Sequence, residues 1–287
     1  MKLRNLAILG PGLLGGSLLL AARRRGLAER ISVWARRDSA LDAVRRLAAA
    51  DLASNALAEV VAEADMVVVC TPVDTVAGLA ERALPHLTAG ALVTDVGSVK
   101  HTIATRLDAA FAARDAQFVG SHPMAGSEQS GIESASADLY TGALAIVTPT
   151  PRSDHAAARR VHALWKALGC RTCEVAPAEH DRIVATISHL PHLAAAALVL
   201  AARDGHDSAL DCLGNGFLDT TRIASGPEAL WRQIVAHNKP AILQALGGFI
   251  DSLGQLRHSI DTEDWRAVED FLGKARQTRD NIRQQAR

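Results

Sequence analysis

The sequence predicts an α/β protein with a parallel β-sheet domain at its N-terminus and an all-α domain at its C-terminus. From Asn5 to about Pro177, short aliphatic runs alternate with longer amphipathic stretches, a pattern that indicates βαβ units. A glycine-rich segment at residues 10–16 follows the first aliphatic run. Beyond Ala178 the strand signals stop, and segments rich in Ala and Leu continue almost to the C-terminus.

Four pairs of a short strand and a helix are expected first. The strands are expected at residues 6–9, 31–34, 66–70 and 91–94, and the helices at residues 13–25, 41–50, 76–87 and 103–113. Because βαβ crossovers are right-handed, these strands should form a parallel sheet with helices on both faces. Three further strand candidates, at residues 117–120, 143–148 and 171–175, are expected to extend that sheet.

The C-terminal part is predicted to be helical near residues 179–204, 207–223, 227–257 and 262–285. We place the boundary after residue 177, which gives domains 1–177 and 178–287. The longest apolar stretch, residues 193–202, is about half of the ~20 residues that a membrane span needs. We therefore expect a buried helix there and no membrane partner. The apolar helices would expose much surface alone, so we expect a homodimer formed through the helical domain.

The composition limits the possible partners and compartments. The chain has 287 residues, and its 31 basic and 31 acidic side chains cancel, without the basic excess that nucleic acid selects. Four cysteines are too few for a disulfide scaffold in a chain of this length. Cys170 and Cys173 form a single CxxC with no second ligand pair nearby, so we predict no metal site. A reducing, cytoplasmic location fits these observations best.

A dinucleotide-binding loop is predicted at residues 10–15, where the chain reads GPGLLG between the first strand and the first helix. Gly10 permits a tight turn, Gly12 allows the backbone to approach a pyrophosphate, and Gly15 allows helix and strand to pack closely. The N-terminus of the helix, at Leu13 and Leu14, supplies N–H donors and a positive dipole. The first domain is therefore expected to be of the Rossmann type.

The end of the second strand indicates which cofactor this loop binds. The acid that would bind the ribose 2′-hydroxyl of NAD is absent there, and Arg36 and Arg37 take its place. Guanidinium groups pair with phosphate oxygens, so NADP is the preferred cofactor and NAD stays possible. In the alternative, both arginines are solvated and Asp38 reaches the ribose. Thr71 and Pro72, directly after the third strand, are also expected in the cofactor site.

Two later segments, residues 120–128 and residues 188–192, are dense in polar groups that a core would avoid. The first follows a strand of the predicted sheet, and ligands of such sheets bind beyond the carboxyl ends of the strands. His122 can therefore face a nicotinamide. In the alternative, a histidine before a proline only ends a strand.

These segments carry a resemblance to a known family. The run GSHPMAGSEQSG at 120–131, DVGSVK at 95–100, SHLPH at 188–192 and GFLDTTRIA at 216–224 with Trp231 look like the prephenate and arogenate dehydrogenase family. The likeness spans nearly the whole chain. It implies the oxidative decarboxylation of a cyclohexadienyl acid, prephenate or arogenate, with hydride transfer to NAD(P) in tyrosine biosynthesis.

The resemblance also implies roles for individual residues. His122 matches the catalytic histidine that accepts the hydroxyl proton, and Ser98 matches the serine that orients it. Arg222 matches the arginine that anchors a substrate carboxylate, a role that suits its planar, bidentate donors. His192 matches a histidine near the substrate side chain. The further positions expected to line, gate or shape the pocket are Ser127, Glu128, Asp219 and Trp231.

Two other functions stay open on sequence alone. A β-hydroxyacid dehydrogenase or imine reductase shares this architecture, but would typically place a catalytic lysine on the first helix of the second domain, where this chain has none. A non-catalytic NADP-sensing protein could also keep the fold. We expect His180 and His189 to be structural and Asp181 to cap a helix.

Overall fold

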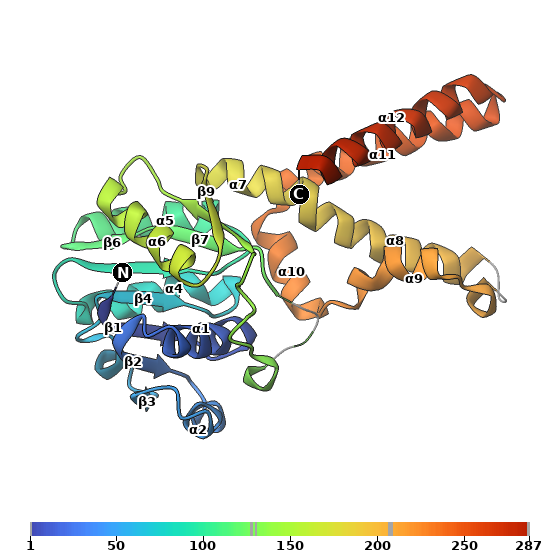
Figure 1. Cartoon of the computed structure of the whole chain (residues 1–287). Coiled ribbons are helices and arrows are strands. Elements are labelled where there is room, and N and C mark those ends of the chain that lie inside the picture. Colours follow the sequence, from blue (N-terminus) through green and yellow to red (C-terminus); the bar gives the residue numbers. More distant parts are fainter. Residues whose placement is uncertain (1, 127–128, 130, 206–208, 286–287) are drawn as a thin grey trace. The chain divides into compact units, whose positions relative to one another are not determined.

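A computed structural model describes residues 2–126, 129, 131–205 and 209–285 (Figure 1). The chain divides into two compact units, Met1–Lys239 and Pro240–Arg287. The first unit holds every strand within the described ranges.

The first unit is built on a six-stranded parallel sheet with the strand order β3-β2-β1-β4-β5-β6. Its strands are β1 (Leu3–Leu9), β2 (Ala28–Trp34), β3 (Leu52–Ser54), β4 (Met66–Val69), β5 (Ala91–Asp95) and β6 (Ala116–Phe118). The strand order reverses between β1 and β4, and a ligand crevice forms at the carboxyl ends of strands at such a point. The predicted Rossmann-type fold is confirmed.

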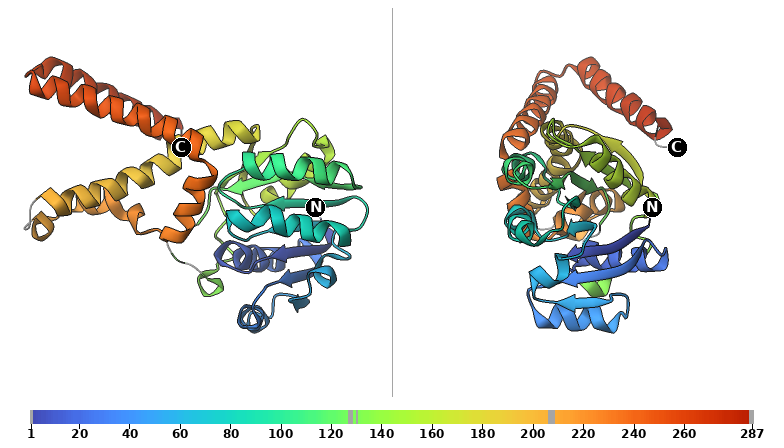
Figure 2. Two further views of the ribbon diagram at one scale, coloured as in Figure 1. Left: turned by 180° about the vertical axis from the view of Figure 1, so that it is seen from behind. Right: turned by 90° about the vertical axis from the view of Figure 1, so that its left-hand side faces the viewer.

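Helices cover both faces of this sheet, as Figures 1 and 2 show. One face is covered by α1 (Leu13–Arg24), α2 (Asp38–Arg46) and α6 (His155–Ala167), and the other by α3 (Leu57–Val61), α4 (Val73–Ala83) and α5 (His101–Ala112). The strands are apolar on both sides because each side faces a helix layer. In β1, Leu6 and Ile8 belong to the first core, whereas Ala7 and Leu9 belong to the second.

Three strands, at residues 117–120, 143–148 and 171–175, were expected to extend this sheet, and only a part of the first of them does. Only β6 joins it, while β7 (Gly120–Pro123), β8 (Leu144–Thr148) and β9 (Arg171–Glu174) form a separate sheet in which β7 and β8 are antiparallel. The side chain of Asp95 explains the break. Its Oδ1 accepts the backbone N–H of Ser121 at 3.2 Å. In a continued parallel ladder, a backbone carbonyl of β5 would accept that N–H instead. The predicted single sheet is therefore wrong beyond Phe118.

The helical part begins in the first unit. Its elements are α7 (Pro177–Val184), a π-turn (Ala185–His189), α8 (Leu190–Gly205), α9 (Asn215–Thr221), a 3₁₀ turn (Arg222–Ser225) and α10 (Glu228–His237). The π-turn ends two residues before Pro191, which has no N–H to donate to the carbonyl of Ile187, and a wider turn accommodates the proline ring. The expected all-α C-terminal part is confirmed.

The stretch at 193–202 is not the buried helix that we expected. In α8 only His192 and Ala195 are buried, and Leu198 and Leu200 are 42% and 51% exposed. The continuous helix Pro177–Gly205 is long and apolar enough to cross a membrane by length and composition alone. Exposure of this kind in one chain marks an interaction surface.

The second unit contains α11 (Lys239–Asp261) and α12 (Trp265–Gln285). The first residue of α11, Lys239, is the last residue of the first unit. A single helix was expected over 227–257, but α10 and α11 are separate because the backbone of Asn238 leaves the helical conformation. Both long helices expose large apolar side chains, among them Leu243, Ile250, Trp265 and Leu272. Two helices alone cannot bury these side chains.

Candidate active site

The glycine loop leaves room for a ligand at the start of α1. Gly10 has a φ of +102°, and a Cβ there would lie 2.7 Å from Thr71 Cγ2. A Cβ on Gly15 would lie 2.1 Å from the carbonyl oxygen of Gly10, so only glycine fits between strand and helix. A Cβ on Gly12 would meet nothing within 4 Å, so its surroundings are open. This is the geometry that a bound pyrophosphate requires.

A groove of about 1230 Å³ runs along this loop. It is lined by Gly10 and Gly12 and by the other predicted cofactor residues Arg36, Arg37, Thr71 and Pro72. Leu13, Leu14 and Gly15 follow Gly12 in the first turn of α1, and no described side chain caps this end of the helix. The buried Thr71 Oγ1 has no hydrogen-bond partner among the described residues. The groove, the open loop and this hydroxyl fit a dinucleotide.

The end of β2 presents a cluster of arginines to the groove. Arg46 lines it together with Arg36 and Arg37. Asp38 is not among the lining residues, and its Oδ1 accepts a 3.2 Å hydrogen bond from Asn55. Asp42 lines the groove, but its Oδ1 accepts from Arg45 at 2.7 Å. Positive charge therefore dominates this end of the groove.

His122 lies inside β7, opposite Ile146 of β8, rather than in a loop after a strand. Only 8% of its surface is exposed, and its Nδ1 lies 2.9 Å from Nε2 of His180. Burial, with His180, Lys100 and His189 nearby, lowers the pKa of His122 well below its usual value. The imidazole is therefore neutral near pH 7 and able to accept a proton.

His180 and Asp181, at the second turn of α7, connect this imidazole to another helix. His180 Nδ1 lies 2.8 Å from Asp181 Oδ1. Asp181 also accepts the backbone N–H groups of Lys100 at 2.8 Å and His101 at 3.0 Å, which start α5. Asp181 therefore caps α5, about 80 residues away in the chain, whereas α7, in which it lies, has Ala176 as its cap residue. His180 was expected to be only structural, but it contacts His122, and no local sequence signal indicates a contact across 58 residues.

A buried ion pair fixes the backbone next to His122. Lys100 and Asp95 are 1% and 0% exposed, and the Lys100 ammonium donates to Asp95 and, at 3.1 Å, to the carbonyl of Ser121. Asp95 accepts the N–H of the same Ser121. The pair therefore holds both sides of the residue that precedes His122. Our sequence reasoning assigned no function to Lys100 or Asp95.

A second group of rings lies at the junction of the π-turn, α8 and α10. His192 stacks on Trp231 with ring centroids 3.5 Å apart and planes 9° apart. A Cβ on Gly226 would lie 2.5 Å from Trp231 Nε1, so that glycine permits the stack. His189 Nδ1 lies 3.1 Å from Asn238 Nδ2, and its buried Nε2 has no partner among the described residues. The structure thus brings together two of the predicted pocket residues.

The other residues predicted for catalysis and substrate binding, where the structure describes them, are more exposed than His122 and His192. Ser98 is half-buried, and the hydrogen-bond partner of His122 among the described residues is His180. Helix α5 begins at His101, with Lys100 as its cap residue, so Ser98 lies in the segment before the helix. Arg222 and Asp219 are exposed, in the 3₁₀ turn and in α9. The predicted residues Ser127 and Glu128 lie outside the described residues.

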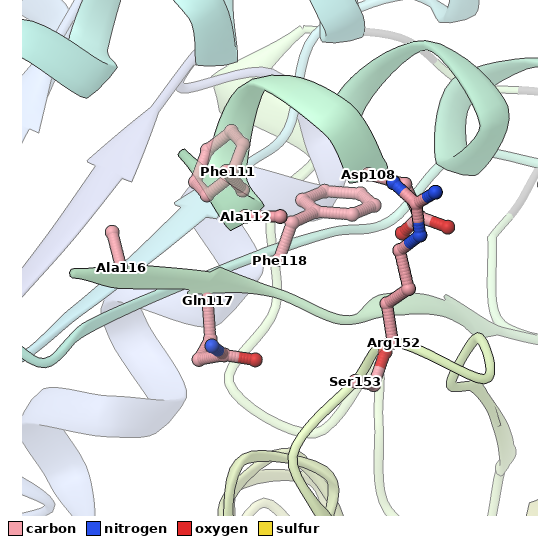
Figure 3. Close-up of a pocket in the computed structure, with 8 residues that line it drawn as sticks. All are labelled: Asp108, Phe111, Ala112, Ala116, Gln117, Phe118, Arg152 and Ser153. Carbon is pink, nitrogen blue, oxygen red and sulfur yellow. The ribbon is translucent and has the colours of Figure 1, made fainter. Parts of the chain in front are cut away.

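A separate small cavity lies between α5, β6 and the segment after β8 (Figure 3). Its volume is about 20 Å³, and its lining includes Asp108, Phe118 and Arg152. A space of this size admits about one water molecule. It is too small for a substrate.

The buried histidines predict a pH-dependent stability. Burial lowers the pKa of His189 to about 4, and the pKa values of His122 and His180 are also lowered, so the folded state binds fewer protons than the unfolded state below pH 6.5. The free energy of unfolding should therefore fall as the pH falls. His189 alone contributes a loss of about 2 kcal/mol between pH 7.5 and pH 5.

Urea unfolding at a series of pH values measures this loss. The His189→Gln variant should show a shallower decline than wild type, and a matched substitution of the exposed His155 should leave the slope unchanged. A free energy of unfolding that stays constant or rises between pH 6.5 and pH 5 would contradict the assignment.

A dinucleotide loop at the switch point of the sheet, with a neutral proton acceptor on a strand beside β5, provides what a nicotinamide-dependent oxidoreductase needs. The protein is assigned to this class. Family models agree: the prephenate dehydrogenase nucleotide-binding domain matches residues 18–174, and the prephenate dehydrogenase dimerization domain matches residues 176–274. The chain belongs to the prephenate dehydrogenase family.

Individual relatives support this membership. The chain is 34% identical to prephenate dehydrogenase of Bacillus subtilis over 97% of this chain and 76% of that protein. It matches a crystal structure of A. aeolicus prephenate dehydrogenase in complex with hydroxyphenyl propionate and NAD+, with a TM-score of 0.91, 32% identity and coverage of 98% and 99%. Synechocystis arogenate dehydrogenase matches with a TM-score of 0.85, 30% identity and coverage of 97% and 99%.

Proposed function

We propose that this chain catalyses the oxidative decarboxylation of a cyclohexadienyl acid, prephenate or arogenate, to a phenol in tyrosine biosynthesis. The family membership gives the substrate class, because the relatives are named for prephenate and for arogenate. The observation that carries the proposal is His122, a buried and neutral imidazole beside the end of β5. A dehydrogenase needs such a group to accept the proton of the substrate hydroxyl.

The chain's residues then act as follows. When bound, the nicotinamide supplies the acceptor for the hydride that leaves the carbinol carbon. His122 accepts the hydroxyl proton, and Ser98 orients the hydroxyl. Arg222 binds a substrate carboxylate, and the stacked pair of His192 and Trp231 forms the pocket wall near the substrate side chain. Carbon dioxide leaves as the ring becomes aromatic.

Three further residues are proposed to complete the substrate pocket. They are Ser127, Glu128 and Asp219. The first two follow His122 in the chain by five and six positions, and Asp219 precedes Arg222 by three. Their roles are to line the entrance and to support the guanidinium of Arg222.

The direct test is a comparison of kcat/KM for prephenate and arogenate, each with NAD and NADP, followed by absorbance at 340 nm. Reduced cofactor should form with at least one cyclohexadienyl acid. The phenolic product and carbon dioxide should appear in equal amounts with it. No reduced cofactor with any of the four combinations would refute the proposed activity.

NADP is the cofactor that we propose for this chain. Arg36, Arg37 and Arg46 line one end of the groove, and a 2′-phosphate would bring two negative charges to them. An Arg36→Ala/Arg37→Ala variant loses two guanidinium groups that would pair with this phosphate. It should therefore lower the ratio of kcat/KM for NADP to kcat/KM for NAD by about tenfold or more, which corresponds to ~1.4 kcal/mol or more.

The matched control is Arg30→Ala, which removes an exposed arginine of β2 that does not line the groove. It should leave the cofactor ratio unchanged. If the wild-type enzyme prefers NAD and the double variant keeps the same preference, these arginines do not bind the cofactor phosphate, and the NADP proposal is wrong.

We propose a homodimer of chains with domains 1–177 and 178–287, joined through the helical domain, in the cytoplasm. The family model for residues 176–274 is named for dimerization. The apolar side chains exposed along α8, α11 and α12 give a second copy a surface to cover. The four cysteines are free thiols, which suits a reducing compartment. Light scattering of the purified chain tests this proposal. The mass of a dimer is expected, and the mass of a monomer would contradict it.

A further inference from the structure

His122 is the end of a chain of hydrogen bonds that starts at helix α5. From Asp181 the chain passes through Nδ1 and Nε2 of His180 to Nδ1 of His122, with separations of 2.8 Å and 2.9 Å. All three side chains are buried. We call this series the Asp181–His180–His122 chain. His180 and Asp181 belong to neither the proposed substrate contacts nor the cofactor groove.

The direction of these hydrogen bonds follows from the groups at the Asp181 end. An ionised carboxylate only accepts hydrogen bonds, and Asp181 already accepts two backbone N–H groups at the positive N-terminus of α5. Its remaining partner, His180 Nδ1, must therefore carry a proton and donate it. A neutral His180 then has a bare Nε2, which can only accept.

The same logic fixes His122. Because His180 Nε2 accepts, His122 Nδ1 must carry the proton of the 2.9 Å hydrogen bond. The one remaining ring nitrogen of His122, Nε2, is then bare. A bare nitrogen is what a base needs, whereas the opposite tautomer would present an N–H to the substrate hydroxyl.

We propose that His180 and Asp181 are positioning residues for the reaction: they hold His122 in the tautomer with the proton on Nδ1, and stabilise the imidazolium that forms when Nε2 takes the substrate proton. The inference rests on the proposed function of His122 as the base. In the step, the substrate O–H bond breaks and its proton moves to Nε2. The proton on Nδ1 stays, and the Asp181 carboxylate faces the new positive charge through His180.

Other charged groups near His122 do not supply this stabilisation. Lys100, on the segment between β5 and α5, is a cation, and its ammonium is already paired with Asp95. His189, in the π-turn, bonds Asn238 through Nδ1. Among the described residues, the carboxylate connected to His122 through a hydrogen-bonded ring is Asp181.

The first experiment observes the tautomer directly. Ring-nitrogen chemical shifts of ¹⁵N-histidine-labelled protein, with His122 assigned by its loss in the His122→Asn variant, should show a protonated Nδ1 and a bare Nε2 at pH 7.5. A protonated Nε2 would overturn the inference. This measurement needs no substrate, so it decides the inference even if the protein oxidises no cyclohexadienyl acid.

The second experiment compares His180→Leu with His180→Gln. Leucine removes the acceptor, so kcat should fall about tenfold to a hundredfold, a part of the full effect of a positioned base. The amide oxygen of glutamine can still accept from His122 Nδ1, so kcat should recover to within a fewfold of wild type. KM and the cofactor Kd should change less than kcat in both variants.

An Asp181→Asn variant tests the charge. It keeps the shape of the side chain and removes the carboxylate, so kcat should fall while cofactor affinity stays near wild type. Thermal unfolding and cofactor binding identify any variant that fails to fold. If His180→Leu does not fold, the comparison of His180→Gln with Asp181→Asn decides the outcome, since only the glutamine variant is expected to keep kcat near wild type. Equal kcat values for wild type, His180→Leu and Asp181→Asn would overturn the inference.

Discussion

We expect the His122→Asn substitution to lower kcat by a factor of about 10² to 10⁴, the usual contribution of a positioned base. The asparagine amide can keep a hydrogen bond to Nε2 of His180, where Nδ1 of His122 now lies. It has no group in the position of the imidazole Nε2. The hydroxyl proton therefore loses its acceptor while the strand around residue 122 keeps its contacts.

Steady-state kinetics and cofactor titration by fluorescence check this expectation. The Kd for the cofactor should stay within about twofold of wild type, since the groove lining does not include His122. His86→Asn, at an exposed histidine, is the matched control and should leave kcat unchanged. A His122→Asn enzyme with nearly full kcat would remove His122 from the chemistry.

We expect the Lys100→Met substitution to lower the free energy of unfolding by about 3 to 5 kcal/mol, because it leaves the Asp95 carboxylate buried without its cation. Both side chains of this pair are at most 1% exposed, so water cannot replace the missing charge. The strand before His122 should loosen as well, since Lys100 also donates to the Ser121 carbonyl. Urea unfolding measures the loss.

The double variant Asp95→Asn/Lys100→Met is the informative control. The single amide oxygen of the introduced asparagine can still accept one of the two backbone N–H groups, those of Gly97 and Ser121, that Asp95 accepts. No charge is buried, so the double variant should recover a part of the stability that the single variant lacks. Equal stabilities for the Lys100→Met variant and wild type would contradict the buried-ion-pair account.

Much of the first unit is predictable because its signals are local. The apolar runs of β1, β2, β4 and β5 and the glycines at their switch point follow directly from the sequence. Strand β3 (Leu52–Ser54) has only three half-buried residues, too few for a period. The second sheet begins where Asp95 Oδ1 accepts the backbone N–H of Ser121, a contact over 26 residues that no periodicity encodes.

The candidate site divides in the same way. The histidine and the glycine loop stand in motifs that a reader of the sequence can find. The partner of His122 is 58 positions away in another helix, and the carboxylate beside it reads locally as a helix cap. Asn238 likewise lies where α10 ends, and its side chain bonds the carbonyl of Asp181 and Nδ1 of His189, contacts that a helical period does not reveal.

The most direct test of the account is a crystal structure of the chain with cofactor and the phenolic product bound. We predict that Nε2 of His122 lies within about 2.6–3.2 Å of the phenol oxygen, with the nicotinamide ring on the same side of the product. An imidazole that makes no hydrogen bond to that oxygen, directly or through one water molecule, would contradict the account.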